Sequence, residues 1–384
     1  MAHAEAWFLY EGEGDTVGEP AELVRESIDV PPPGPLEAHV APLYGAWEGN
    51  MGHAVSRRPT DVCRARREQR VVLGNGGVVR VLEVGSEVTQ VKPGQAALLT
   101  SAANLDEFGY HKLIHGFDAP GTVGLLATRI NLPETSLAPL PADTRHSLQQ
   151  WAAFGCRYTA AWSNWRLAFG TFRLQVSAGQ LPAPNVWGWG GGTTLAELDL
   201  ARREGCNVVM LSGTDSHIAT IERTGVTAVD RRAFGDLTFD DRRFVTDAEY
   251  RRAYSRAERA FLEEVRNRTD GRLVQIFVDY IGTPVFRATL KALGREGVLT
   301  TAGWRDGMSM GFLRAHECIL RRQHIHTHYA SHDEVKDAVE YGERTGWMPQ
   351  IDDDVTPYDE IPELSRRFLV GEVPVFPIYS VNPE

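Results

Sequence analysis

A cluster of glycines between two apolar segments constrains the fold of this chain more than any other feature. The segment Asn185–Trp189 runs into the cluster, a helical pattern follows over residues 194–204, and a second apolar segment covers residues 208–211. Strand, glycine-rich turn, helix and strand in this order predict a βαβ unit. The turn is typical of a pyrophosphate-binding loop, because only glycine lets backbone N–H groups come close to phosphate at a helix N-terminus. The residues expected to contact the pyrophosphate are Gly188, Gly190, Gly191, Gly192, Thr193 and Thr194.

The residues after the second apolar segment select between the two nicotinamide dinucleotides. In NAD-binding units, a carboxylate about 20 residues after the first glycine holds the ribose 2′-hydroxyl. Here Ser212, Gly213 and Thr214 follow the segment, and the nearest carboxylate is Asp215. Hydroxyl and backbone N–H groups without a negative charge suit a 2′-phosphate, so we expect these three residues to bind NADPH. The alternatives are that Ser212 only starts a turn, and that Asp215 reaches back to the ribose.

The composition limits the class of protein. The 384 residues exceed one ordinary domain, so we expect two domains. The formal net charge of −11 argues against nucleic acid and against an anionic membrane surface as partners. The chain has no apolar run of membrane-spanning length and no signal-peptide pattern, and its four cysteines form neither a CxxC pair nor a disulfide-like spacing. A reduced, cytoplasmic protein fits these observations best.

The patterning divides the chain into three parts. Up to about residue 150, short apolar runs between Gly and Pro turns predict strands, for example over residues 78–84. Helices then alternate with apolar strands up to about residue 329. An insertion over residues 232–270 interrupts this alternation, and we expect its amphipathic helix, residues 249–268, to pack on the domain. The last part ends in a predicted strand over residues 373–378, between prolines.

Three motifs, in order, resemble the medium-chain dehydrogenase/reductase superfamily. They are Val88-Thr89-Gln90-Val91-Lys92-Pro93-Gly94, the turn from Gly188 to Thr194, and Val278-Asp279-Tyr280-Ile281-Gly282 followed by residues 294–299. Within the superfamily the chain is most similar to the crotonyl-CoA carboxylase/reductase branch. The features that carry this similarity are Ala228-Val229-Asp230-Arg231 before the long insertion, and His328-Tyr329-Ala330-Ser331-His332-Asp333-Glu334.

The resemblance implies an α/β fold with two domains. A GroES-like, β-rich catalytic domain is expected over residues 1–150 and is completed by residues 330–384. A Rossmann NADP-binding domain, with a doubly wound parallel sheet, is expected over residues 151–329.

The positions that bind metal in zinc-dependent members of the superfamily carry unsuitable residues here. The first ligand position falls near Trp47, the second is Asn75, and only Cys156 offers a ligand of the usual type. One thiolate and one amide do not hold zinc, so we expect no metal. Reduction of an activated C=C bond is then the expected chemistry. Hydride goes to the β-carbon, and the substrate oxygen needs only hydrogen-bond donors as the enolate forms.

The resemblance also implies three site residues outside the glycine turn. His328 aligns with a histidine that helps to hold carbon dioxide next to the enolate, and Asn50 falls where the branch carries a pocket asparagine. Thr159 corresponds to a threonine near the nicotinamide. The structural alternative for His328 is a surface or core histidine on a strand with alternating side chains. The structural alternative for Thr159 is a hydroxyl that caps a helix or lies inside one.

Two residues of the glycine turn depart from the usual pattern. Thr194 takes the place of the last glycine, and Trp189 puts a bulky side chain inside the turn. Both can reshape the pyrophosphate site or weaken cofactor binding, so a chain that has lost redox activity is an alternative.

We therefore predict an NADPH-dependent, zinc-independent reductase that acts on the C=C bond of an α,β-unsaturated acyl thioester or an enone. Reductive carboxylation is an extension of this prediction. We expect a small-molecule substrate, with CoA or a carrier protein as its candidate carriers, and a homodimer or homotetramer. The alternatives are a quinone or aldehyde reductase of the same fold, and a non-redox protein that uses the fold for binding or for another reaction.

Overall fold

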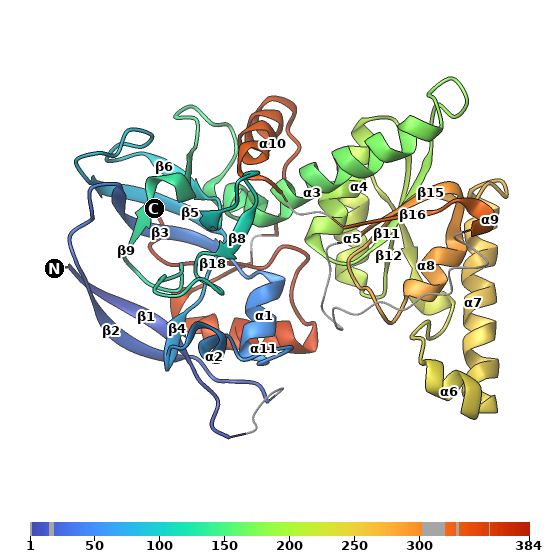
Figure 1. Ribbon diagram of the computed structural model, residues 1–384, viewed down its shortest axis with the longest axis horizontal. Helices are drawn as coiled ribbons and strands as arrows, with labels where there is room; N and C mark the ends of the chain where they lie inside the picture. The colour runs from blue at the N-terminus through green and yellow to red at the C-terminus, as the bar shows by residue number, and fades with distance from the viewer. Residues whose placement is uncertain (1, 15–18, 302–318, 328–329, 353) are drawn as a thin grey trace. The chain divides into compact units, whose positions relative to one another are not determined.

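The structure is a computed structural model that describes residues 2–14, 19–301, 319–327, 330–352 and 354–384. The chain forms two compact units, of which unit 1 comprises residues 1–159 and 330–384, and unit 2 comprises residues 160–329 (Figure 1). In the described ranges, no helix is both long and apolar enough to cross a membrane.

Unit 1 is built mainly from antiparallel strands. These are β1 (Ala2–Tyr10), β2 (Val24–Val30), β3 (Glu37–Ala46), β4 (Arg70–Val72), β5 (Gly77–Val84), β6 (Ala96–Leu99), β7 (Ala102–Leu105), β8 (His111–Ile114), β9 (Ile130–Pro133), β10 (Leu137–Pro139), β17 (Val355–Thr356) and β18 (Ile378–Ser380). The largest sheet has the order β10-β6-β5-β3-β18-β17, with β9 also paired to β3. A second sheet has the order β2-β1-β4, and β7 and β8 form a separate pair.

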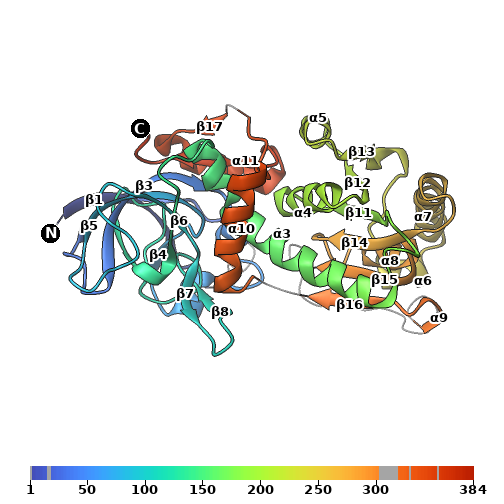
Figure 2. The same cartoon turned by 90° about the horizontal axis from the view of Figure 1, so that it is seen from above.

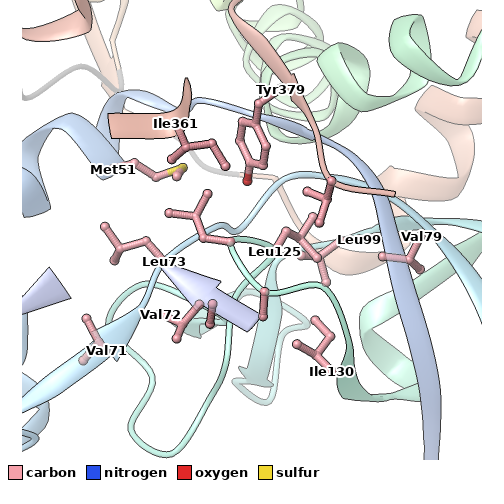
Figure 3. Packing of buried hydrophobic residues seen from close by; sticks show 14 of the residues in the cluster. Met51, Val71, Val72, Leu73, Val79, Leu99, Leu125, Ile130, Ile361 and Tyr379 are labelled. Carbon is pink, nitrogen blue, oxygen red and sulfur yellow. The ribbon is translucent and has the colours of Figure 1, made fainter. Parts of the chain in front are cut away.

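The helices of unit 1 pack against these sheets. They are α1 (Gly49–Val55), α2 (Val62–Arg66), α10 (His332–Thr345), α11 (Ile361–Val370), the 3₁₀ turns η1 (Glu134–Ser136) and η4 (Tyr358–Glu360), and the first part of α3 (Leu148–Gln175). The core between sheets and helices is apolar, with Met51 of α1, Leu73, Leu125, Ile361 of α11 and Tyr379 of β18 among its buried members (Figure 3). Burial of such side chains is the main favourable term in folding.

Unit 2 is a six-stranded parallel sheet with helices. Its strands are β11 (Asn185–Trp189), β12 (Asn207–Ser212), β13 (Thr227–Asp230), β14 (Val274–Asp279), β15 (Leu293–Thr301) and β16 (His324–Thr327), and their order is β13-β12-β11-β14-β15-β16. Its helices are the second part of α3, α4 (Gly192–Arg203), α5 (Asp215–Arg223), η2 (Arg231–Ala233), α6 (Asp241–Thr246), α7 (Ala248–Arg268), α8 (Phe286–Ala292) and α9 (Ile319–Arg321). Figure 2 shows β11, β12 and β14 side by side with α4 next to them.

The inserted helix α7 packs on the sheet of unit 2, as its amphipathic pattern predicts. The Asp247 carboxylate caps it by accepting from the backbone N–H groups of Glu249 and Tyr250, each at 3.0 Å. Phe261, on its apolar face, lies 5.2 Å from Trp189 of β11 between ring centroids. The insertion is therefore an integral part of the core of unit 2.

The predicted strand over residues 373–378 is wrong in its position. The structure forms β18 over Ile378–Ser380 instead, paired with β3 and β17. Pro374 and Pro377 have no N–H to donate to a strand ladder, so regular pairing begins after the second proline.

Candidate functional site

The glycine turn of unit 2 joins the end of β11 to the start of α4. A Cβ on Gly188 would lie 2.8 Å from Thr194 Cγ2 and 2.9 Å from the Val278 carbonyl oxygen. Gly190 has a φ of +150°, and a Cβ there would collide with the Thr194 hydroxyl. Both positions thus require glycine. The missing side chains make room for Thr194, which is fully buried, so this substitution fits the turn.

Trp189 does not obstruct the open side of the turn. Its side chain is buried in the core of unit 2, where its ring centroid lies 5.0 Å from that of Phe277 and 5.2 Å from that of Phe261. Successive side chains of a strand point to opposite faces, so Gly188 faces α4 while Trp189 faces α7. The bulky residue is therefore part of the core of unit 2 and does not fill the glycine turn.

The N-terminus of α4 offers donors for an anion. Gly191 is the N-cap residue, it is exposed, and as a glycine it has no side chain to cap the first turn. The first N–H groups of an α-helix have no partner within the helix, and the helix dipole places partial positive charge there. Gly192, Thr193 and Thr194 contribute these groups, which fits the predicted pyrophosphate contact.

At the end of β12, an arginine that the sequence analysis did not select lies over the turn. A Cβ on Gly213 would lie 2.8 Å from Arg231 Nε. Ser212 is buried, with its hydroxyl 3.4 Å from the backbone nitrogen of Thr214. The one available signal for Arg231 was its place at the end of the motif Ala228-Val229-Asp230-Arg231. The cluster of hydroxyls, backbone N–H groups and a guanidinium suits a phosphate monoester.

Asp215, the carboxylate nearest to the end of β12, has a partner of its own. It starts α5 and forms an ion pair with Arg232, which also pairs with Asp230 at 2.8 Å. The alternative in which Asp215 holds a ribose hydroxyl would have to compete with this pair.

Unit 1 brings together Asn75 and Cys156, two of the three positions that we expected to correspond to metal ligands in zinc-dependent proteins. Asn75 Nδ2 lies 3.8 Å from Cys156 Sγ, and the thiol also lies 3.3 Å from the Asn75 carbonyl oxygen and 2.7 Å from the Ser101 hydroxyl. Burial, with a smaller contribution from the Glu48 carboxylate, raises the pKa of the Cys156 thiol to about 12. The thiol is therefore protonated at neutral pH. In the described ranges, no three His, Cys, Asp or Glu side chains are placed to share a metal ion.

A buried ion pair lies beside this thiol, and the sequence analysis did not select it. Arg157 Nη1 lies 3.2 Å from Glu48 Oε1, and the side chains are only 7% and 9% exposed. Arg157 Nη2 also donates to the Trp47 carbonyl oxygen at 2.7 Å. Burial raises the pKa of Glu48, and the Arg157 charge opposes that shift. Neither Arg157 Nη1 nor Glu48 Oε1 has a hydrogen-bond partner among the described residues. The two side chains therefore attract each other through their charges, in a geometry that does not form a hydrogen bond.

The three remaining predicted site residues differ in what the structure describes. Asn50 lies in the first turn of α1, two residues after Glu48, and its Oδ1 is buried without a hydrogen-bond partner among the described residues. The Thr159 hydroxyl donates to the Gly155 carbonyl at 3.0 Å, as a hydroxyl inside a helix does. His328 lies outside the described residues.

Solved structures of known proteins resemble the chain over nearly its whole length. The crotonyl-CoA carboxylase/reductase AntE in complex with NADP is 22% identical, with a TM-score of 0.79 over 99% of this chain and 95% of that chain. The 2-octenoyl-CoA carboxylase reductase CinF in complex with NADP and 2-octenoyl-CoA is 19% identical, with a TM-score of 0.80 over 100% and 88% of the two chains. A putative alcohol dehydrogenase from Sinorhizobium meliloti is 17% identical, with a TM-score of 0.73 over 99% of each chain.

No family model and no curated protein matches the chain. At 17–22% identity, the structural likenesses show the fold. The predicted α/β fold is thereby confirmed: the chain has the fold of the medium-chain dehydrogenases/reductases, with a GroES-like part and a Rossmann part, and it resembles the crotonyl-CoA carboxylase/reductase branch.

Proposed function

We propose that this chain is an NADPH-dependent, zinc-independent reductase of the C=C bond of an α,β-unsaturated acyl thioester or enone. The observation that carries the proposal is the anion cradle of unit 2. It combines an uncapped helix N-terminus after a glycine turn with a guanidinium over the turn that follows the next strand. Proteins of this fold that were solved with NADP support the choice of cofactor.

The residues present fit the pyrophosphate and the 2′-phosphate of NADPH. The backbone N–H groups of Gly192, Thr193 and Thr194, at the start of α4, would hold the pyrophosphate. The turn before them has no room for a side chain at Gly188 or Gly190. The 2′-phosphate would be held by the hydroxyl and backbone N–H groups of Ser212 and Thr214 and by the Arg231 guanidinium.

NADPH, when bound, supplies a hydride to the β-carbon of the substrate. The protein must then stabilise the negative charge that develops on the substrate oxygen, and hydrogen-bond donors are sufficient for this. Asn50 is our candidate donor through its side-chain NH2 group, by its resemblance to the pocket asparagine of the branch. His328 and Thr159 stay proposed site residues, for the fate of the enolate and for contact with the nicotinamide.

The enoyl thioester class is supported by the neighbours, two of which carry crotonyl-CoA or 2-octenoyl-CoA in their names. A putative alcohol dehydrogenase has a similar structure, and aldehyde or quinone reduction is therefore the alternative. Carboxylation coupled to reduction and assembly into a homodimer or homotetramer belong to the same proposal.

The test is NADPH oxidation by the purified protein with four substrate classes: medium-chain enoyl-CoA thioesters, enones, quinones and aldehydes, each with and without bicarbonate. We expect turnover with the first or second class, NADPH preferred over NADH, and a saturated or carboxylated product by mass spectrometry. Turnover confined to quinones or aldehydes would replace the substrate class. Failure to bind NADPH at all would overturn the proposal.

A further inference from the structure

A buried hydrogen-bonded chain lies next to the glycine turn in unit 2, and none of the roles proposed above uses it. The Tyr280 hydroxyl donates to Glu197 Oε2 at 3.1 Å and accepts from the side-chain amide of Asn164. Glu197 lies in α4 and Asn164 in α3, and both are fully buried. The helices α3 and α4 and the loop after β14 thus contribute one polar side chain each to this hydrogen-bonded chain.

Tyr280 stands at the topological switch point of the sheet. The helix after β11 leads to β12 on one side of β11, whereas β14 lies on its other side. Open α/β sheets bind ligands in the crevice outside the carboxyl ends of the strands at such a point. Gly190 follows β11 and Tyr280 follows β14, and a Cβ on Gly190 would lie 3.0 Å from Tyr280 Cβ. The ring is therefore held at the wall of the crevice.

Glu197 is buried without a compensating cation among the described residues. The charged neighbours on its own helix are occupied: Asp199 pairs with Arg202 at 2.7 Å and with Arg203 at 3.0 Å. At the end of β14, the Asp279 carboxylate accepts a hydrogen bond from the Gly282 backbone N–H at 2.8 Å, within the loop that follows the strand. Tyr280 is thus the one ionisable group described as bonded to Glu197.

These surroundings favour the neutral form of Glu197. Burial raises its pKa well above the usual value, and the Tyr280 hydrogen bond opposes this only in part. Glu197 Oε1 and Asn164 Oδ1 are buried and have no hydrogen-bond partner among the described residues. A proton on the carboxyl group supplies a donor to a cluster that otherwise has an excess of acceptors.

We propose that Glu197, acting through Tyr280, is a positioning residue of the dinucleotide crevice, and that tight NADPH binding requires the proton that Glu197 carries. The inference rests on the proposed NADPH-dependent function. Glu197 lies five residues after Gly192, the first residue of α4, which is about 8 Å along the helix axis. An ionised carboxylate there opposes the phosphates of NADPH through a poorly screened interior, which weakens binding about tenfold.

The test is the pH dependence of NADPH affinity in the full chain, measured by fluorescence titration over the whole pH range in which the protein stays folded. In the wild type, affinity should fall about tenfold as the pH rises through the pKa of Glu197. Glu197→Gln keeps the shape and a hydrogen-bonding side chain but does not ionise, so this fall should disappear. Glu204→Gln is the matched control: Glu204 follows α4, is bonded to Trp165 Nε1 at 3.0 Å, and should leave the wild-type profile unchanged.

Two further measurements keep the test decisive if Glu197→Gln folds poorly. Tyr280→Phe removes the hydrogen bond that lowers the Glu197 pKa, so the fall in affinity should move to higher pH. The infrared absorption of a protonated carboxylic acid should be present in the wild type at neutral pH and reduced in Glu197→Gln.

Each outcome has a distinct meaning. A pH profile of NADPH binding that is the same in the wild type and Glu197→Gln, or an infrared difference without the acid band, overturns this inference alone. Absence of NADPH binding by the wild type overturns the proposed function, and this inference with it.

Discussion

Replacing Arg231 by glutamine should weaken NADPH binding and leave NADH binding unchanged. The substitution keeps a side chain of similar reach but removes the charge that lies over Gly213. NADH has no 2′-phosphate, so it does not use this charge. The two nucleotides therefore separate a lost phosphate contact from general damage to the crevice.

The size of the effect follows from the surroundings of Arg231. A hydrogen bond to a charged group contributes about 1.5–3 kcal/mol. Arg231 is exposed, so solvent screening reduces the expected contribution to about 1–2 kcal/mol. This corresponds to NADPH binding that is about 5–30-fold weaker.

Fluorescence titration with both nucleotides measures this effect directly. Arg223→Gln is the matched control, because Arg223 is an exposed arginine on α5 whose guanidinium donates to the Thr220 hydroxyl at 3.1 Å. It should leave both affinities unchanged, whereas Arg231→Lys should keep part of the NADPH preference. An unchanged ratio of NADPH to NADH affinity in Arg231→Gln would refute the assignment of the 2′-phosphate site.

Four other predictions can be tested with standard measurements. Ser212→Asp should reverse the nucleotide preference through like-charge repulsion, at a cost of roughly 1–3 kcal/mol to NADPH binding, and equal titration curves for both nucleotides with the unmodified protein would contradict it. Elemental analysis should find no zinc, and chelators should leave turnover unchanged, because the aligned ligand positions hold one thiol and no imidazole. His328→Ala or Asn50→Ala should lower turnover about a hundredfold or change the product, with NADPH affinity within a few-fold, and no change in either variant would refute the alignment at the site. Trp189→Ala should lower the free energy of unfolding by about 3–5 kcal/mol in denaturant titrations, because it empties a buried aromatic site, and a loss below about 1 kcal/mol would contradict the described packing.

The local elements of unit 2 could be predicted from the sequence because their causes are local. A strand buried on both faces of a parallel sheet needs an apolar side chain at most positions, so residues 208–211 indicated β12 to within one residue. The glycine turn was equally readable, since a tight strand-to-helix turn without room for side chains needs glycine. The last strand was predicted too early, because an apolar run that contains Pro374 and Pro377 does not show which N–H groups take part in a ladder.

The polar clusters could not be predicted, because each joins segments that are far apart in the chain. Glu48 and Arg157 meet through the packing of α1 and α3 in unit 1, and in the sequence each is an ordinary charged residue. Arg231 reaches the turn after β12 only because β13 pairs with β12.

The sequence by itself determined the alternation of strands and helices in unit 2, the glycine turn and the absence of a carboxylate at the end of β12. The tertiary structure decided which charged side chains are buried, which form ion pairs and which lie next to the anion cradle of unit 2. Glu197 illustrates the reason: helical periodicity places it on α4, but only the packing of α3 and β14 against that helix removes its water and leaves Tyr280 as its described hydrogen-bond partner. Periodicity is a property of neighbouring residues, whereas burial and charge pairing depend on contacts between distant ones.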